Sequence, residues 1–113
     1  MIKKVGDEFK LLFIIVKKDL SRRVIKACKK GGAEGGTVLI GRGIGTHDTG
    51  SIFGVKVEPE KAVILSVVPD ELVDKVISKV RAAARLDKPG TGIAFVVNSK
   101  SICGVAHLLK NDF

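Results

Sequence analysis

Residues 61–96 read KAVILSVVPDELVDKVISKVRAAARLDKPGTGIAFV, and this stretch carries the clearest structural signals in the chain. Ala62–Val68 is an apolar run rich in β-branched residues, which is typical of a buried strand. Pro69 and the two acids after it predict a helix start, because proline and carboxylates suit a helix N-terminus. Pro89–Gly90 ends the helix, and Ile93–Val97 predicts the next strand. The apolar face of the helix is expected to consist of Leu72, Val73, Val76, Ile77, Val80, Ala83 and Ala84.

The residues before this stretch show the same order of strand and helix. Leu11–Val16 is a continuous apolar run that predicts a strand buried on both faces. Residues 20–30 then change to a helical period. Ser21 or Asp19 is expected to cap the start of this helix, and Gly31–Gly32 to end it. Its apolar face is expected to consist of Leu20, Val24, Ala27 and Cys28, with Ile25 at the edge.

A further strand at Thr37–Ile40 completes the order β-α-β-β-α-β. This order predicts an α+β, ferredoxin-like fold with a four-stranded antiparallel sheet and two helices on one face. The domain is expected to span residues 11–113, after a charged N-terminal extension at 1–10. Gly41–Gly54 is a glycine-rich connection, and the loop after the second strand is expected to span residues 43–60. Ser101–Leu109 is expected to add a short fifth strand or a final turn.

The predicted strands LLFIIV, AVILSVV and IAFVV are apolar at nearly every position. Two helices can cover only one face of a four-stranded sheet. The other face would then expose an apolar patch of a size that monomers avoid. The sequence therefore predicts self-association through the open face of the sheet.

The composition limits the class of protein. The chain has 113 residues, which is one domain, and it is 45% apolar but only 4% aromatic. The net charge of +8 favours either an anionic partner or a solvated basic surface. Cys28 and Cys103 lack a CxxC spacing and are expected to be reduced, buried thiols of a cytoplasmic protein. Leu11–Val16 is too short to insert into a membrane.

The ordered set of elements and residues resembles the P-II nitrogen-regulatory family. The similarity is clearest over Lys61–Val96, and it continues without gaps from Ile14 through Gly35–Thr37 to Gly43–Gly45. In that family, three subunits form a trimer, and adenine nucleotides bind in the clefts between subunits. A long loop between the second and third strands, the T-loop, reports the ligand state to target proteins.

The resemblance implies a non-enzymatic, homotrimeric signal-transduction protein. Such a protein senses a small effector and regulates a partner protein through its loop, and the family name suggests nitrogen metabolism. No catalytic residue is expected. The resemblance places the effector against three glycine-containing segments and two apolar side chains: Gly35, Gly36, Thr37, Gly43, Gly45, Gly90, Thr91, Gly92, Ile15 and Val67.

Several positions depart from the family pattern. The lysine that reaches the phosphates is replaced by Ile93, and two phosphate-binding arginines fall on Gly104 and Ala106. The arginine and glutamine at the base of the T-loop fall on Thr46 and His47. Each lost charge-assisted hydrogen bond is worth about 1.5–3 kcal/mol, so tight ATP binding in the usual mode is not expected.

The identity of the effector therefore stays open. No cofactor is certain, and ATP, ADP or another adenine nucleotide is the class that the resemblance implies. Lys61, Arg42 or Lys88 could replace the lost cations. The loop is shorter than is usual in the family, and a chain without Tyr cannot carry the family's uridylylation tyrosine.

The loop tip offers a candidate contact for the partner protein. Thr49, Ile52 and Phe53 place an apolar pair in a polar, glycine-flanked setting. Such a pair can dock on a partner or fold back onto its own subunit.

Other functions have weaker support. His47–Asp48 alone is too few ligands for a metal site, although a trimer could pair them with His107, and no metal ligand is assigned. An RNA-binding domain of the same strand order needs aromatics on its central strands, and Phe95 alone does not supply them, so no nucleic-acid partner is expected. The remaining alternatives are a trimeric interaction module without nucleotide sensing and a trimeric metal-binding protein of the copper-tolerance type.

Overall fold

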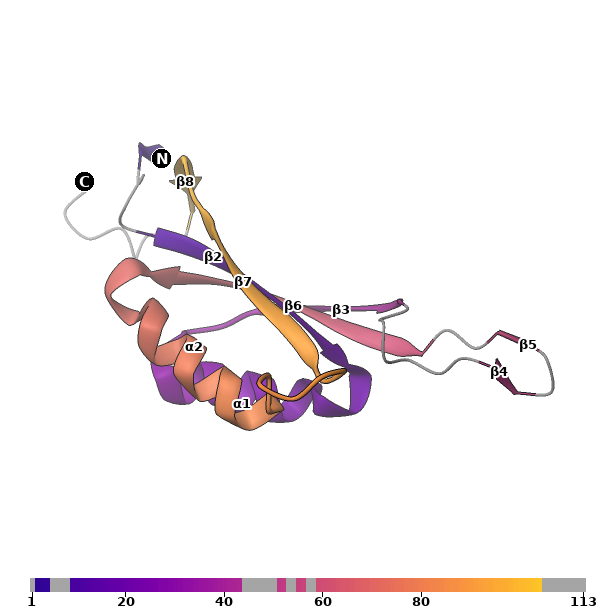
Figure 1. Ribbon diagram of the computed structural model, residues 1–113. Helices are drawn as coiled ribbons and strands as arrows, with labels where there is room; N and C mark the ends of the chain where they lie inside the picture. Colours follow the sequence, from indigo (N-terminus) through magenta and orange to yellow (C-terminus); the bar gives the residue numbers. More distant parts are fainter. Residues whose placement is uncertain (1, 5–8, 44–50, 53–54, 57–58, 105–113) are drawn as a thin grey trace.

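The structure is a computed structural model that describes residues 2–4, 9–43, 51–52, 55–56 and 59–104. Its main sheet has four strands in the order β3-β6-β2-β7, all antiparallel to their neighbours. Two helices cover one face of this sheet (Figure 1). The strands are β2 (Phe9–Lys17), β3 (Thr37–Arg42), β6 (Glu60–Pro69) and β7 (Gly92–Asn98), and the helices are α1 (Ser21–Gly31) and α2 (Asp70–Ala84). The predicted ferredoxin-like fold is confirmed.

Two short strand pairs lie outside the main sheet. β1 (Ile2–Lys4) pairs with β8 (Ser101–Cys103), and β4 (Ser51–Ile52) pairs with β5 (Val55–Lys56). Part of the expected N-terminal extension is therefore a strand. The prediction that Cys103 is buried is wrong, because β8 lies beyond the layer that the helices cover and leaves this thiol exposed.

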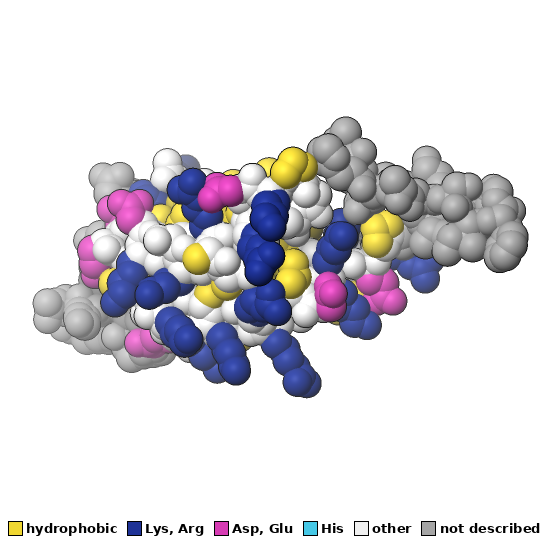
Figure 2. Space-filling model, turned by 60° about the horizontal axis from the view of Figure 1, so that its bottom comes forward, with side chains coloured by type: hydrophobic (Ala, Val, Ile, Leu, Met, Phe, Trp, Pro, Cys, Tyr) yellow, Lys and Arg dark blue, Asp and Glu magenta, His cyan; other side chains and the backbone are white. Residues whose placement is uncertain are grey.

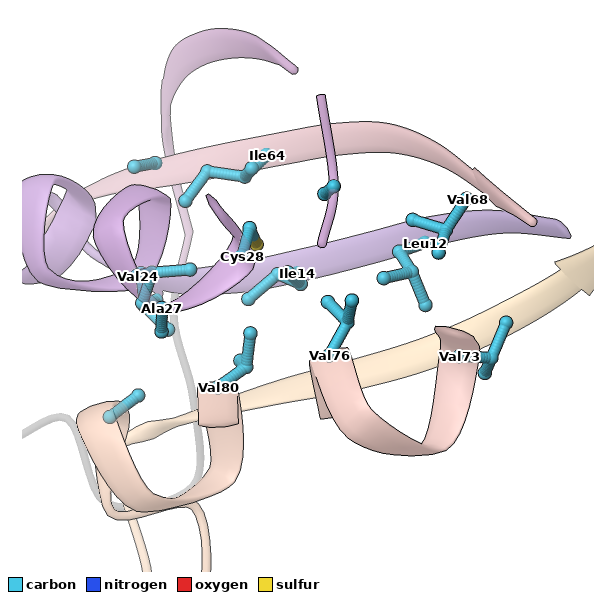
Figure 3. Packing of buried hydrophobic residues seen from close by; sticks show 14 residues of the cluster. Leu12, Ile14, Val24, Ala27, Cys28, Ile64, Val68, Val73, Val76 and Val80 are labelled. Atoms are coloured by element: carbon cyan, nitrogen blue, oxygen red, sulfur yellow. The ribbon is translucent and has the colours of Figure 1, made fainter. Parts of the chain in front are cut away.

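The core lies between the sheet and the helices, as Figure 3 shows. Alternate residues of the two central strands point toward the helices and are buried, and Leu12, Ile14 and Val68 are among them. Val24, Ala27 and Cys28 of α1 meet them from the other side, with Val73, Val76 and Val80 of α2. The predicted apolar faces of both helices are confirmed: their remaining members are buried or packed against this cluster.

The start of α1 differs from the prediction. A single turn of 3-10 helix, η1 (Lys18–Leu20), leads directly into α1, and no side chain caps the first turn. The prediction that Ser21 or Asp19 caps α1 is wrong, because the 3-10 turn supplies the preceding backbone carbonyls instead. The end of the helix is as predicted: Gly32 adopts a left-handed conformation with φ 109°, and the Ala33 N–H donates to the Cys28 carbonyl at 3.0 Å.

The open face of the sheet is apolar, as predicted. Residues directly opposite each other in the strand register share a face, so the register identifies the set. Phe13 and Phe95 lie opposite each other on this face, with parallel rings whose centroids are 5.2 Å apart. The set consists of Leu11, Phe13, Ile15, Leu39, Val63, Leu65, Val67, Ile93, Phe95 and Val97.

No described helix covers this face, so several of its side chains are exposed in a single chain. Ile93 is 55% exposed and Phe95 is 42% exposed. Leu11–Val16 is therefore buried on one face only within one chain. Self-association, which would bury its other face, stays a prediction.

Candidate functional site

The predicted cleft residues divide into two groups at opposite edges of the sheet. Gly35–Thr37 lie at the β3 edge, where Thr37 pairs with Leu65, and Val67 lies two residues further along the neighbouring inner strand β6. Gly90–Gly92 lie at the β7 edge, and Ile15 lies on the neighbouring inner strand β2, opposite Ile93. The two inner strands separate these edges, and neighbouring strands are about 4.8 Å apart. One chain therefore does not assemble the predicted cleft.

Contacts with β6 hold the group at the β3 edge in place. The hydroxyl of Ser66, which is only 3% exposed, donates to the Gly35 carbonyl at 2.6 Å. A Cβ at Gly36 would lie 3.0 Å from the Leu65 carbonyl oxygen, so glycine allows the chain to approach β6 closely. Around Gly35 there is space, because a Cβ there would meet nothing within 4 Å. Sequence reasoning missed Ser66, the one polar residue inside an apolar strand.

At the β7 edge, contacts within the chain hold the turn at Gly90–Gly92 in place. The Thr91 hydroxyl lies 2.9 Å from the Arg85 carbonyl oxygen and 3.1 Å from that of Lys88, and either oxygen can accept its hydrogen bond. Gly90 has a φ of 81°. A Cβ at Gly92 would lie 2.4 Å from the Ile15 carbonyl oxygen. Packing against β2 thus requires glycine at this position, whether or not a ligand is near.

Two lysines lie at the end of the sheet from which the loop leaves. Lys17 of β2 and Lys61 of β6 are directly opposite in the register, so they share the open face. Gly41 of β3 is the neighbour of Lys61 on the other side. Two cations on one face of the sheet attract an anion to this end of the molecule. Sequence reasoning considered Lys61 but missed Lys17, whose position depends on the register.

The base of the loop lies beside Lys61. The Gly43 N–H donates to the Pro59 carbonyl at 3.3 Å, and a Cβ at Gly43 would lie 3.5 Å from Cγ of Lys61. An anion bound at the Lys61 ammonium group would therefore lie close to the base of the loop. Gly45, Thr49 and Phe53 lie outside the described residues, and Ile52 is described only as a backbone position of β4.

The positions that replace the family's cations differ in their surroundings. Ile93 lies opposite Ile15 on the open face and presents an apolar side chain there. Gly104 has a φ of 95° and, for a Cβ, nothing within 4 Å. Ala106 lies outside the described residues. Lys88 lies in the exposed turn before Gly90, and Arg42 is an exposed residue at the end of β3.

A pocket of about 250 Å³ lies under the end of α1, beside Gly35 and Gly36. Cys28, Ile64 and Ser66 form part of its lining. Burial raises the pKa of the Cys28 thiol, which keeps it protonated at neutral pH. A protonated thiol is a weak nucleophile, so this pocket lacks an activated cysteine.

Among residues 9–43 and 59–104, no cluster of three His, Cys, Asp or Glu side chains could hold a metal ion. His47, Asp48 and His107 lie outside the described residues. None of the helices in the described parts of the chain is long and apolar enough to cross a membrane.

Comparison with known proteins agrees with this fold. The sequence model of the nitrogen regulatory protein P-II family matches residues 9–105. Among solved structures, the chain is similar to one described as Arabidopsis thaliana PII bound to citrate, at 26% identity and a TM-score of 0.68. That similarity covers 88% of this chain and 85% of the other. A search of curated proteins found no match.

Proposed function

Since the chain belongs to the nitrogen regulatory protein P-II family, we propose that it is a homotrimeric signal-transduction protein that binds an anionic effector between its subunits. Members of this family regulate other proteins rather than catalyse reactions. In this chain, effector binding changes the loop at residues 43–60, and the loop regulates a partner protein. The free thiols of Cys28 and Cys103 are consistent with the cytoplasm.

The observation that carries the proposal is the division of the predicted cleft between two sheet edges. Gly35–Thr37 lies at the β3 edge and Gly90–Gly92 at the β7 edge, so a complete cleft needs the edges of two chains. The exposed apolar face supports the same assembly, because association would bury it. A ring of three chains joins each β7 edge to a neighbouring β3 edge and leaves none unpaired.

The proposed effector is an anion with carboxylate or phosphate groups. Lys17 and Lys61 supply two positive charges at the end of the open face, while Ile93 provides an apolar surface where the family has a cation. A related protein has been described as bound to citrate, which supports a small carboxylate as an effector class. An adenine nucleotide stays a candidate through the family, held by the glycine segments rather than by a lysine at residue 93.

The position of Lys61 links the effector to the loop. Its side chain runs beside Gly43, and Lys61 follows Glu60, where β6 leaves the loop. An effector bound at Lys61 in one loop conformation and not in another shifts the population toward the first.

A thermal-shift series with citrate, 2-oxoglutarate, ADP and ATP tests this function, with light scattering to measure the mass. We expect a trimer and a concentration-dependent rise in Tm with at least one of these anions. Lys61→Gln should reduce the shift, and Gly90→Asp should abolish it by placing a carboxylate in the turn. Lys75→Gln, on the exposed side of α2, is the matched control.

A second candidate is a trimeric interaction module that has lost effector sensing. Ile93 and Gly104 favour it, because both replace cations of the family. A trimer whose Tm responds to none of the four anions would support this function and contradict the sensor. A monomer at micromolar concentration would contradict both.

A further inference from the structure

The outer face of α1 is a row of cations. Within Ser21–Gly31 there are five basic residues and no acidic one, and all five side chains are exposed. Figure 2, which brings the bottom of Figure 1 forward, shows Lys and Arg spread across this side of the molecule. These cations are Arg22, Arg23, Lys26, Lys29 and Lys30.

Among the described residues, none of these five cations is in an ion pair. Asp19 lies in η1 directly before α1, but among the described residues it forms no ion pair with these cations. Asp70, Glu71 and Asp74 are on α2, and Asp87 is paired with Arg81 at 2.8 Å. The positive charge of α1 is therefore not neutralised within the described part of its own subunit, and an anionic partner would find it available.

A groove continues this row at the start of α1. It has a volume of about 530 Å³, and Ile40 and Pro59 give it an apolar part. Ile40 points to the same side of the sheet as Ala62, toward the helices, yet it is 51% exposed. Lys17, Lys18 and Arg22 also line the groove, and Lys18 is paired with Glu60 at 3.2 Å. The groove thus combines an exposed apolar side chain with three cations and two carboxylates, those of Asp19 and Glu60.

We propose that α1 and this groove bind an acidic segment of a partner protein, with its carboxylates on the α1 cations and an apolar side chain on Ile40. Arg22 and Lys26 are four residues apart, a rise of about 6 Å along the helix. An acidic helix that lies along α1 repeats its carboxylates at the same interval. The α1 cations are separate from the effector site, whereas the groove borders that site at Lys17 and borders the loop at Pro59.

A membrane or a nucleic acid fits this surface less well. The apolar side of α1, with Val24, Ala27 and Cys28, is buried in the core and cannot enter a lipid layer. A phosphate backbone would satisfy the cations but would leave Ile40 without an apolar contact. Self-association through the open face also leaves α1 accessible, because the helix covers the opposite face of the sheet.

The test uses a capped, glutamate-rich helical peptide that carries one leucine, titrated into the whole protein by fluorescence anisotropy and two-dimensional amide NMR. We expect shifts at η1, α1 and Ile40, and no binding of a peptide with glutamine at each glutamate position. The double variant Arg22→Glu/Lys26→Glu should weaken binding about tenfold or more. Ile40→Ser should weaken the leucine peptide but not its alanine counterpart.

Lys75→Glu/Lys79→Glu is the matched control, because it reverses two exposed charges at the same spacing on α2. It should retain most of the affinity. Equal losses of peptide affinity in the two double variants would mean that binding depends only on net charge. That result would overturn the proposal. So would tighter, α1-dependent binding of phosphatidylserine vesicles or duplex DNA. Arg22→Gln/Lys26→Gln repeats the test if the reversed variant does not fold, as judged by circular dichroism.

Discussion

Single residues show how the same sequence signal can have two physical origins. Glycines at 35, 36, 90 and 92 were all expected beside an effector. The structure separates them: close packing against β2 requires glycine at residue 92, Gly36 is in tight contact with β6, and Gly35 faces open space. A sequence pattern alone cannot make this distinction, because it depends on which strand lies next to each residue.

Gly92→Ala should destabilise the fold. The new Cβ would lie 2.4 Å from the Ile15 carbonyl oxygen, and the φ of 152° is unfavourable for alanine. We expect a loss of about 2–4 kcal/mol in the free energy of unfolding, measured by urea denaturation. Gly35→Ala is the control and should change stability by less than about 0.5 kcal/mol. Equal effects at the two positions would contradict the packing difference.

The Cys28 thiol makes stability depend on pH. Its pKa is raised in the folded state by burial, so the unfolded chain loses the thiol proton first as the pH rises. The stabilising contribution is therefore complete below the pKa of the unfolded thiol, about 8.5, and is lost as the pH rises toward the folded value. Urea midpoints at increasing pH should fall more steeply for the wild type than for Cys28→Ala. Parallel curves would count against this effect.

At the scale of the elements, hydrophobic periodicity was sufficient to predict the order of strands and helices. The core strands and the helices each show a clear apolar period, and burial of that face decides their structure. β4, β5, β1 and β8 are only two or three residues long, and their pairing depends on a partner rather than on a period. The predicted N-terminal cap of α1 was wrong for a similar reason. The 3-10 turn before the helix has no sequence signal that separates it from the helix itself.

The packing of α1 on α2 depends on Gly31. A Cβ at this position would lie 2.7 Å from Cα of Val76, so alanine would push the helices apart. We expect Gly31→Ala to cost about 1–3 kcal/mol of unfolding free energy, despite the better helix propensity of alanine. Lys30→Ala, one residue away and exposed, is the comparison. A Gly31→Ala variant as stable as Lys30→Ala would show that the helices are not in close contact here.

For the whole molecule, we expect the open face to determine the oligomeric state. Phe95→Asp would place a charge next to Phe13 on a face that the proposed trimer buries. We expect light scattering to give a monomer for this variant and a trimer for the wild type. Lys75→Asp, on the helical side, should remain a trimer. A trimeric Phe95→Asp protein would place the interface elsewhere.

The predictable part of the candidate site was its backbone. The resemblance to the P-II family indicated the glycine segments, but their separation at two edges and the Lys17–Lys61 pair depend on strand order and register. Those are properties of the folded sheet, since a shift of one residue would move every side chain to the other face.

The division of the cleft between the β3 and β7 edges has a genetic consequence. In the proposed trimer, a subunit with a mutation at one sheet edge still contributes its intact opposite edge to the cleft that it shares with its neighbour. Two inactive homotrimers, one impaired at residues 35–37 and the other at 90–92, would exchange subunits and form mixed rings. Each mixed ring would contain one junction between two undamaged edges. Two alleles that are each null for effector response should therefore complement one another when expressed in the same cell.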